Sequence, residues 1–228
     1  MRILKNNIKI TKYLTPLGMI AVISYFIHAF LGQILWKEYN PLTTDISSLT
    51  ANGAPNAELL GIFTLIYGIA FLLFTLGMVA IAFEKYHKVT KIGFLLFMIM
   101  ALTSLVGYAF FPLTSDKFAM NFQNMMHILT TVIVTFTTIF SIYIIGYGYL
   151  KKEKLKKLGK ICIVAASLII FFGFLNPIAI ALQINIVGLT ERLVIFILMI
   201  FTFLLSFIYT FDINSFLRKY KKPQSIEK

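Results

Sequence analysis

Six side chains capable of acid–base or metal chemistry fall near one end of the apolar runs that dominate this 228-residue sequence. They are His28, Asp45, Asp116, His127, Glu191 and Arg192. The two histidines lie inside apolar runs, where an ionisable side chain is costly and usually serves a function. Imidazole nitrogens and carboxylate oxygens bind divalent metals, and a metal-activated water can hydrolyse a lipid ester or amide. Metal-dependent lipid hydrolysis is therefore one chemistry these residues could perform.

The spacing of these residues gives no HExxH or other tight pair of metal ligands. A divalent metal stays open as a cofactor, with His28, His127 and Asp45 as candidate ligands. A second interpretation explains each residue separately, because Asp45 can cap a helix, Glu191 can pair with Arg192, and a nearby hydroxyl can bond each histidine. Serine nucleophiles gain no support, since no GxSxG motif is present. Whether the chain is an enzyme stays open.

Long apolar runs must position these residues. Hydrophobic residues make up 59% of the chain and the mean hydropathy is +0.86, whereas soluble domains are about 45–50% apolar. A spanning helix needs about 20 apolar residues, and strand alternation is absent. The sequence predicts an all-α, single-domain bundle over residues 1–228 with six transmembrane helices. Their expected spans are about 13–36, 59–83, 92–111, 125–149, 161–183 and 193–211.

Lysine and arginine are distributed unevenly between the two ends of the predicted helices. One side carries 18 of the 21 basic residues, including the whole segment KKEKLKKLGK. The positive-inside rule places this side in the cytoplasm, so both termini, including the tail 212–228, are expected there and the protein in the cell membrane. Basic residues scattered over four short segments cannot form a nucleic-acid surface. Membrane lipids are the expected partners.

A polar segment at residues 37–58 separates the first two helices on the predicted extracellular side. Asp45 or Thr44 can cap a short helix in DISSLTA, and Asn52 with Gly53 ends it. Connections longer than about 12–15 residues are usually lids, binding loops or linkers. The capping and turn signals favour an ordered extracellular lid.

The fourth predicted helix carries a polar stripe. Its members recur at helical spacing: His127, Thr131, Thr135, Thr138 and Ser141. Serine and threonine often mediate close helix packing in membranes, so packing and a polar pocket are both possible. The next helix contains Pro177, which should free the carbonyl of Gly173, with Asn176 placed to compensate. Thr190 is expected to cap the last helix.

Several motifs resemble one membrane family. They are YNPLTTDISSLTANGAPNAELLG, GYAFFPLTSD, MMHILTT and GLTERL. Together they resemble the bacterial and archaeal family known as domain of unknown function 998, and a fainter likeness links the DIS loop to the Frag1 and DRAM group of six-helix membrane proteins. The resemblance implies a multi-pass membrane fold with no assigned activity. It carries over Asp45, Ser47, Pro112, His127, Glu191 and Arg192, while Ser48 stands where the family has an acid.

These observations predict an outward-facing polar pocket beneath the lid. The candidate lining residues are His28, Asp45, Ser47, Asp116, His127, Thr131, Glu191 and Arg192. The leading hypothesis is that the pocket binds or modifies a lipid or another amphiphile. Transport of a small solute is the first alternative. A structural or accessory role without a ligand is the second, with homo-oligomerisation or a place in a membrane complex possible.

Overall fold

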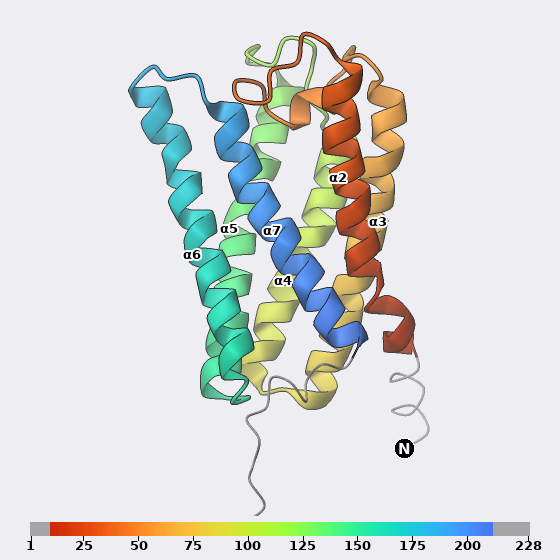
Figure 1. Ribbon diagram of the computed structural model, residues 1–228, viewed down its shortest axis with the longest axis vertical. Coiled ribbons are helices and arrows are strands. Elements are labelled where there is room, and N and C mark those ends of the chain that lie inside the picture. Colours follow the sequence, from red (N-terminus) through yellow and green to blue (C-terminus); the bar gives the residue numbers. More distant parts are fainter. Residues whose placement is uncertain (1–9, 212–228) are drawn as a thin grey trace, which may run out of the picture.

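The computed structural model describes residues 10–211, and the regular structure in this range is helical throughout (Figure 1). The elements are α2 (Leu17–Leu35), the 3-10 helix η1 (Ser47–Thr50), α3 (Ala57–Lys85), α4 (Lys88–Phe110), α5 (Phe122–Lys151), α6 (Lys156–Ala181) and α7 (Val187–Thr210). Six helices are long and apolar enough to cross a membrane, the first running from Ile10 to Leu35. The predicted six-helix, all-α bundle is confirmed. The expectations for residues 1–9 and for the tail 212–228 lie outside the described residues.

The helices form a ring in chain order. Each long helix contacts the next one along the sequence, and α7 returns to contact α2 (Figure 1). The α3–α4, α5–α6 and α6–α7 connections are short, and a short turn joins antiparallel neighbours. The bundle has two ends, which differ in the composition of their connections. We call the end with the lysine-rich α3–α4 and α5–α6 connections the basic end, and the end with residues 36–56, 111–121 and 182–186 the loop end.

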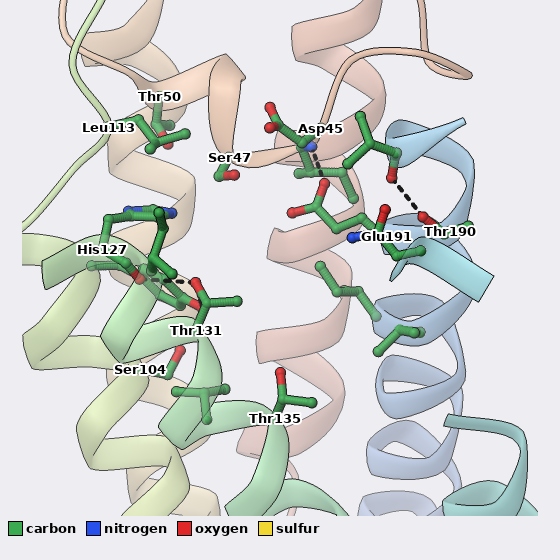
Figure 2. Close-up of a pocket in the computed structure, with 18 of the residues that line it drawn as sticks. Asp45, Ser47, Thr50, Ser104, Leu113, His127, Thr131, Thr135, Thr190 and Glu191 are labelled. Carbon is green, nitrogen blue, oxygen red and sulfur yellow. Dashed lines mark hydrogen bonds between the residues drawn. The ribbon is translucent and has the colours of Figure 1, made fainter. Parts of the chain in front are cut away.

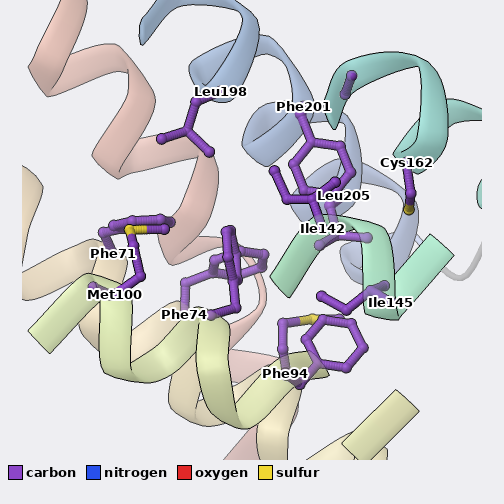
Figure 3. Packing of buried hydrophobic residues seen from close by; sticks show 14 of the residues in the cluster. Phe71, Phe74, Phe94, Met100, Ile142, Ile145, Cys162, Leu198, Phe201 and Leu205 are labelled. Atoms are coloured by element: carbon purple, nitrogen blue, oxygen red, sulfur yellow. The ribbon is translucent and has the colours of Figure 1, made fainter. Parts of the chain in front are cut away.

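Large apolar side chains fill the half of the ring next to the basic end (Figure 3). Phe71 and Phe97 meet edge to face at 5.4 Å between ring centroids, and Phe97 meets Phe201 at 6.2 Å. Phe74 and Tyr149 are completely buried in the same cluster. Edge-to-face packing of this kind stabilises apolar cores beyond simple burial. The interior of the bundle is therefore filled by packed side chains in the half next to the basic end.

Small residues let the helices of this half approach closely. A Cβ added at Gly148 would lie 2.3 Å from the Thr90 hydroxyl, so α5 and α4 touch almost backbone to backbone. A Cβ at Gly146 would lie 2.9 Å from Cys162 on α6. Close approach at small residues is the usual means of helix association in membranes. These contacts fix α4, α5 and α6 together near the basic end.

The last helix begins earlier than the sequence predicts. α7 starts at Val187, six residues before the expected start, and Ile186 occupies the N-cap position. Thr190 is therefore inside the helix, with its hydroxyl donating to the Val187 carbonyl at 3.0 Å, and the expectation that it caps the helix was wrong. Gly188 permits the extension because its bare Cα packs against backbone atoms of Pro41 and Thr44. This first turn of α7 docks on the segment 36–56.

Candidate functional site

A cavity of about 1380 Å³ occupies the half of the ring next to the loop end (Figure 2). All six long helices contribute lining residues, and the segment 36–56 lies over it. Sites for drug-sized ligands usually enclose about 300–1,000 Å³. The cavity is therefore large enough for a ligand bigger than most small metabolites.

The lining changes from polar to apolar with depth. Under the loops, Asp45, Ser47, His127 and Glu191 face the space. Towards the basic end the wall is mainly apolar, although Thr135 and Thr138 also line it there. The deeper apolar residues are Met100, Val134, Ile169, Val194, Leu198 and Met199. Because Met100, Ile169 and Leu198 also belong to the apolar core, the core forms the floor of the cavity.

Arg192 fixes the segment 36–56 onto α7. Its guanidinium donates hydrogen bonds to the carbonyls of Pro41 at 2.8 Å, Thr44 at 2.9 Å and Gly188 at 2.9 Å. It also donates to the Tyr39 hydroxyl, which in turn donates to the carbonyl of Asp45. Such bonds from a fixed cation are stronger than neutral ones. Arg192 therefore holds the segment in place and does not line the cavity.

Tyr39 belongs to this clamp and is nearly inaccessible, with 6% of its surface exposed. Burial raises the pKa of Tyr39 to about 12, although the hydrogen bond from Arg192 acts in the opposite direction. The hydroxyl is therefore neutral at physiological pH and available as a donor. Trp36 packs beside it with ring centroids 5.5 Å apart.

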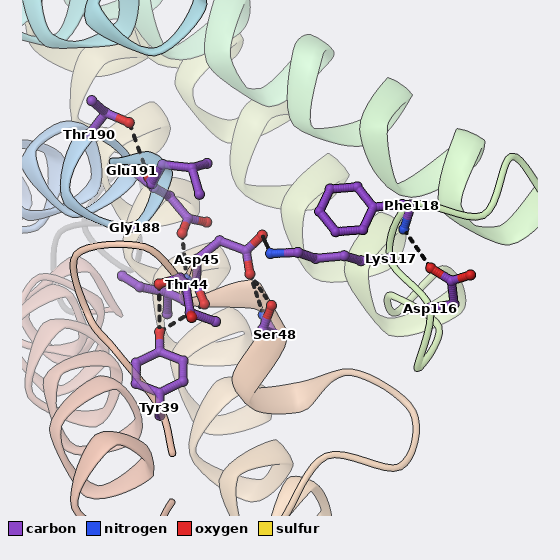
Figure 4. A network of polar contacts seen from close by, with 12 residues as sticks. Tyr39, Thr44, Asp45, Ser48, Asp116, Lys117, Phe118, Gly188, Thr190 and Glu191 are labelled. Atoms are coloured by element: carbon purple, nitrogen blue, oxygen red, sulfur yellow. Dashed lines mark hydrogen bonds and ion pairs between the residues drawn. The ribbon is translucent and has the colours of Figure 1, made fainter. Parts of the chain in front are cut away.

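Two loops are joined across the top of the cavity (Figure 4). Asp45 of the first loop pairs with Lys117 of the α4–α5 connection at 3.3 Å, and its other oxygen accepts from the Ser48 amide and hydroxyl. The Asn52 amide donates to the Leu113 carbonyl at 2.8 Å. We call these two segments, 36–56 and 111–121, the roof. The roof is an ordered structure with both side-chain and backbone ties.

Glu191 directly precedes Arg192 in the sequence but faces the cavity. One carboxylate oxygen accepts a hydrogen bond from the Ile46 amide of the roof, and the residue lines the space below (Figure 4). Among residues 10–211, no lysine, arginine or histidine forms an ion pair with it. Its carboxylate is thus the one acidic group of the lining without a cationic side-chain partner in the described chain.

The two histidines line the same cavity but differ in their hydrogen bonding. His28 is 2% exposed, and neither ring nitrogen has a hydrogen-bond partner among the described residues. His127 has Nδ1 at 2.8 Å from the Phe111 carbonyl. Since a carbonyl oxygen can only accept, Nδ1 of His127 must carry the proton. A neutral His127 then presents Nε2 as an acceptor.

Six of the eight predicted site residues line this one cavity. They are His28, Asp45, Ser47, His127, Thr131 and Glu191. Asp116 does not, because its carboxylate accepts from the Phe118 amide within the α4–α5 connection. Arg192 is directed at the roof, as described above. Thr131 receives a hydrogen bond from Tyr108 at 3.2 Å and donates to the His127 carbonyl.

A family model described as protein of unknown function (DUF998) matches residues 19–208. The chain belongs to this family. The matched range covers both roof segments and most or all of each of the six long helices, so the family resemblance seen in the sequence motifs is confirmed. The likeness to the Frag1 and DRAM group stays a prediction. No curated protein and no solved structure matches the chain.

The cavity of this DUF998 chain also has lining residues that the sequence did not single out as site candidates. Tyr25, Tyr67 and Tyr108 line it, as do Lys117 and Asn176. The Asn176 amide oxygen is buried without a hydrogen-bond partner among the described residues. A tyrosine inside an apolar run is indistinguishable in sequence from a core aromatic. Only the packing of the ring shows which tyrosines reach the interior space.

The candidate metal ligands of the DUF998 chain do not form a cluster. Between residues 10 and 211, no three His, Cys, Asp or Glu side chains lie close enough to share an ion. Asp45 is already paired with Lys117, and His127 is bonded through Nδ1. A divalent metal at His28, His127 and Asp45 stays a prediction.

Proposed function

We propose that this membrane protein binds a lipid or a lipid-like amphiphile in the cavity beneath the roof. The polar headgroup lies at the roof near Glu191 and His127, and the hydrocarbon chain lies against the apolar residues below. The observation that carries the proposal is the gradient of the lining, polar at the loop end and apolar at the floor. A ligand that fits both parts must itself be amphiphilic, because unpaired polar groups and exposed apolar surface are each costly.

The side of the ring between α5 and α6 offers a route for a membrane lipid. Near the basic end these helices are tied, for example by the Tyr143 and Ser167 hydroxyls at 2.8 Å. Nearer the loop end, three apolar residues of these helices line the cavity and are largely exposed: Ile128 at 58%, Val132 at 45% and Ile180 at 67%. An acyl chain can enter between them from the surrounding bilayer.

The loop end faces outward in this proposal, with both termini in the cytoplasm. The support is the lysine-rich basic end, which the positive-inside rule assigns to the cytoplasmic side. The ligand would then come from the outer leaflet of the cell membrane. Orientation can be tested with a membrane-impermeant maleimide on intact cells, using Asn52→Cys and Lys152→Cys. Cys162 is fully buried and supplies little background. Labelling of Lys152→Cys but not of Asn52→Cys would show that the orientation is the opposite of the one proposed.

Solute transport is less well supported by the packing. A transporter needs a polar path beyond the floor, but the polar stripe of α5 supplies none in this state. The Thr138 hydroxyl donates to the Val134 carbonyl at 2.7 Å and the Ser141 hydroxyl to the Thr138 carbonyl at 2.9 Å. These groups are satisfied by their own helix. The aromatic core fills the space beyond them.

Native mass spectrometry of protein purified in mild detergent tests binding. We expect the wild type to retain an amphiphile that is released by Gly173→Phe. Gly173 lines the cavity, and a Cβ there would meet only the Val194 side chain at 3.9 Å, so a larger side chain extends into the space without a backbone clash. Val164→Phe is the control, because it adds the same ring to a lipid-facing position of α6 that is 57% exposed.

The two variants separate loss of binding from loss of folding. Both should elute as monodisperse protein and unfold at similar temperatures in detergent. Retention in the wild type and Val164→Phe, with loss in Gly173→Phe, supports the proposal. If wild-type protein carries no amphiphile in several detergents, or if Gly173→Phe retains the same mass as the wild type, the cavity does not hold the ligand proposed here.

A further inference from the structure

We infer that the headgroup of the amphiphile carries an amine whose ammonium pairs with Glu191. This inference rests on the proposed function and names the chemical class of its ligand. Three independent features of the cavity support it: the charge of the lining, the kind of hydrogen-bonding groups left free, and the aromatic rings around them.

The charges of the lining leave one carboxylate unmatched. Asp45 and Lys117 neutralise each other at 3.3 Å. Arg192, although next to Glu191 in sequence, directs its guanidinium to roof carbonyls and to Tyr39. Among residues 10–211, Glu191 accepts a hydrogen bond from the Ile46 amide alone. A carboxylate removed from water keeps its charge at low cost only when it is paired, and a cationic headgroup supplies such a partner.

Three free hydrogen-bonding groups of the lining are acceptors, while His28, whose two ring nitrogens are also unpaired among the described residues, offers one donor and one acceptor when neutral. His127 offers Nε2, because its Nδ1 proton is directed at the Phe111 carbonyl. The Asn176 amide oxygen is buried and unpaired among the described residues, and one oxygen of Glu191 makes no hydrogen bond there. An ammonium has three donors and no acceptor. A headgroup that is only a carboxylate or phosphate would instead place acceptors against acceptors.

Tyrosine rings complete the surroundings. Tyr25 and Tyr67 both line the cavity, with their rings edge to face at 4.9 Å between centroids. Tyr108 lines it as well and packs against His127 at 5.0 Å. The faces of such rings attract cations, most strongly where water is excluded. Aromatic rings near an unmatched carboxylate favour an ammonium over a neutral hydroxyl.

Three probes with the same hydrocarbon chain test the headgroup directly: oleylamine, oleyl alcohol and oleate. Their retention is measured by native mass spectrometry on delipidated protein at equal probe concentration. We expect oleylamine to bind at least about tenfold more tightly than oleyl alcohol, which corresponds to about 1.4 kcal/mol, and oleate to bind weakest. Glu191→Gln should remove the preference for the amine, since the amide keeps an acceptor for the Ile46 amide but has no charge.

A matched variant and the alcohol probe keep the outcomes distinct. Asp116→Asn removes a carboxylate that does not line the cavity, and it should bind the three probes as the wild type does. Glu191→Gln should still bind oleyl alcohol, which shows that the variant is folded. Equal binding of all three probes by the wild type overturns the amine inference and leaves amphiphile binding intact. Binding of none of them overturns both.

The ammonium could belong to a phospholipid headgroup or to a simple long-chain base. Lysophosphatidylethanolamine and lysophosphatidylglycerol of one chain length separate these sources. Preference for the ethanolamine lipid, lost in Glu191→Gln, identifies a phospholipid amine. Retention of oleylamine without either lysophospholipid identifies a long-chain base. Preference for the glycerol lipid contradicts the inference.

Discussion

Removing the guanidinium of Arg192 should release the roof from α7. The variant Arg192→Met keeps a long apolar stem but deletes every hydrogen bond of the clamp. Three of those bonds reach the segment 36–56, at the Pro41 carbonyl, the Thr44 carbonyl and the Tyr39 hydroxyl. The fourth stays within α7, at the Gly188 carbonyl.

The size of the effect follows from these contacts. A hydrogen bond to a charged group contributes about 1.5–3 kcal/mol net. The Tyr39 hydroxyl shares its single proton between the Asp45 carbonyl at 2.7 Å and the Thr44 carbonyl at 3.1 Å, so Thr44 keeps part of a hydrogen bond when Arg192 is removed. We therefore expect the free energy of local opening to fall by about 3 kcal/mol, which raises the equilibrium constant for opening roughly 140-fold. Lys117→Met should cost about 0–1 kcal/mol, because its ion pair with Asp45 is partly exposed.

Hydrogen exchange monitored by mass spectrometry measures this opening. The reporters are backbone amides held by the docked roof: Thr43 and Thr44 donate to the Asn40 carbonyl, and Ile46 donates to Glu191. Amides in such local units exchange at rates set by the free energy of opening. Faster exchange should be confined to the roof and the first turn of α7.

Peptides from the aromatic core serve as the internal reference, because their exchange should be unchanged. If the roof amides of Arg192→Met exchange at the wild-type rate, Arg192 does not hold the segment and its assignment as a structural clamp is wrong. If Lys117→Met has the larger effect, the ion pair across the roof, rather than the guanidinium, holds the roof closed.

Two further changes probe the same docking. Gly188→Ala should lower the unfolding temperature, with a cost of about 1–3 kcal/mol, because its Cβ would lie 2.3 Å from the Thr44 carbonyl oxygen. Gly173→Ala is the control and should leave the unfolding temperature unchanged, because its Cβ would meet nothing closer than 3.9 Å. Equal effects of the two substitutions would contradict the close contact at Gly188. Burial raises the pKa of Tyr39 to about 12, above its unfolded value of about 10, so its neutral form is favoured by folding. That contribution, at most about 3 kcal/mol, is full below pH 10 and declines between pH 10 and 12. Thermal unfolding of Tyr39→Phe should thus depend less on pH in this window than that of the wild type, and identical pH dependence would show that Tyr39 does not contribute.

The helices of this fold follow from the sequence with little ambiguity. Six runs of about 20 apolar residues can cross a membrane in few conformations other than helices, because every backbone polar group must be hydrogen-bonded within the segment. The boundaries are harder, as α7 shows. Its first six residues include a glycine and several polar side chains, and in this turn Gly188 packs closely on the backbone of the roof.

The start of α7 determines which of the predicted site residues line the cavity. With Glu191 and Arg192 placed in a loop, both were expected in the pocket. Within α7, neighbouring residues point about 100° apart, so Glu191 faces the cavity and Arg192 faces the roof. Asp116 was misplaced for a related reason, since a loop residue has no periodicity from which its direction can be predicted. His28 and His127 both line the cavity, and helical spacing allowed the face of each to be predicted.

Photo-crosslinking tests the central claim, that an amphiphile occupies the cavity, most directly. A photoactivatable long-chain amine is added to protein in nanodiscs, and labelled peptides are identified by mass spectrometry. We predict labels on cavity-lining stretches of α5, α6 and α7, around Thr135, Asn176 and Leu198, that are lost in Gly173→Phe and kept in Val164→Phe. Labels confined to outward-facing residues and unchanged in Gly173→Phe would show that the probe stays in the bilayer and that the cavity holds no such ligand.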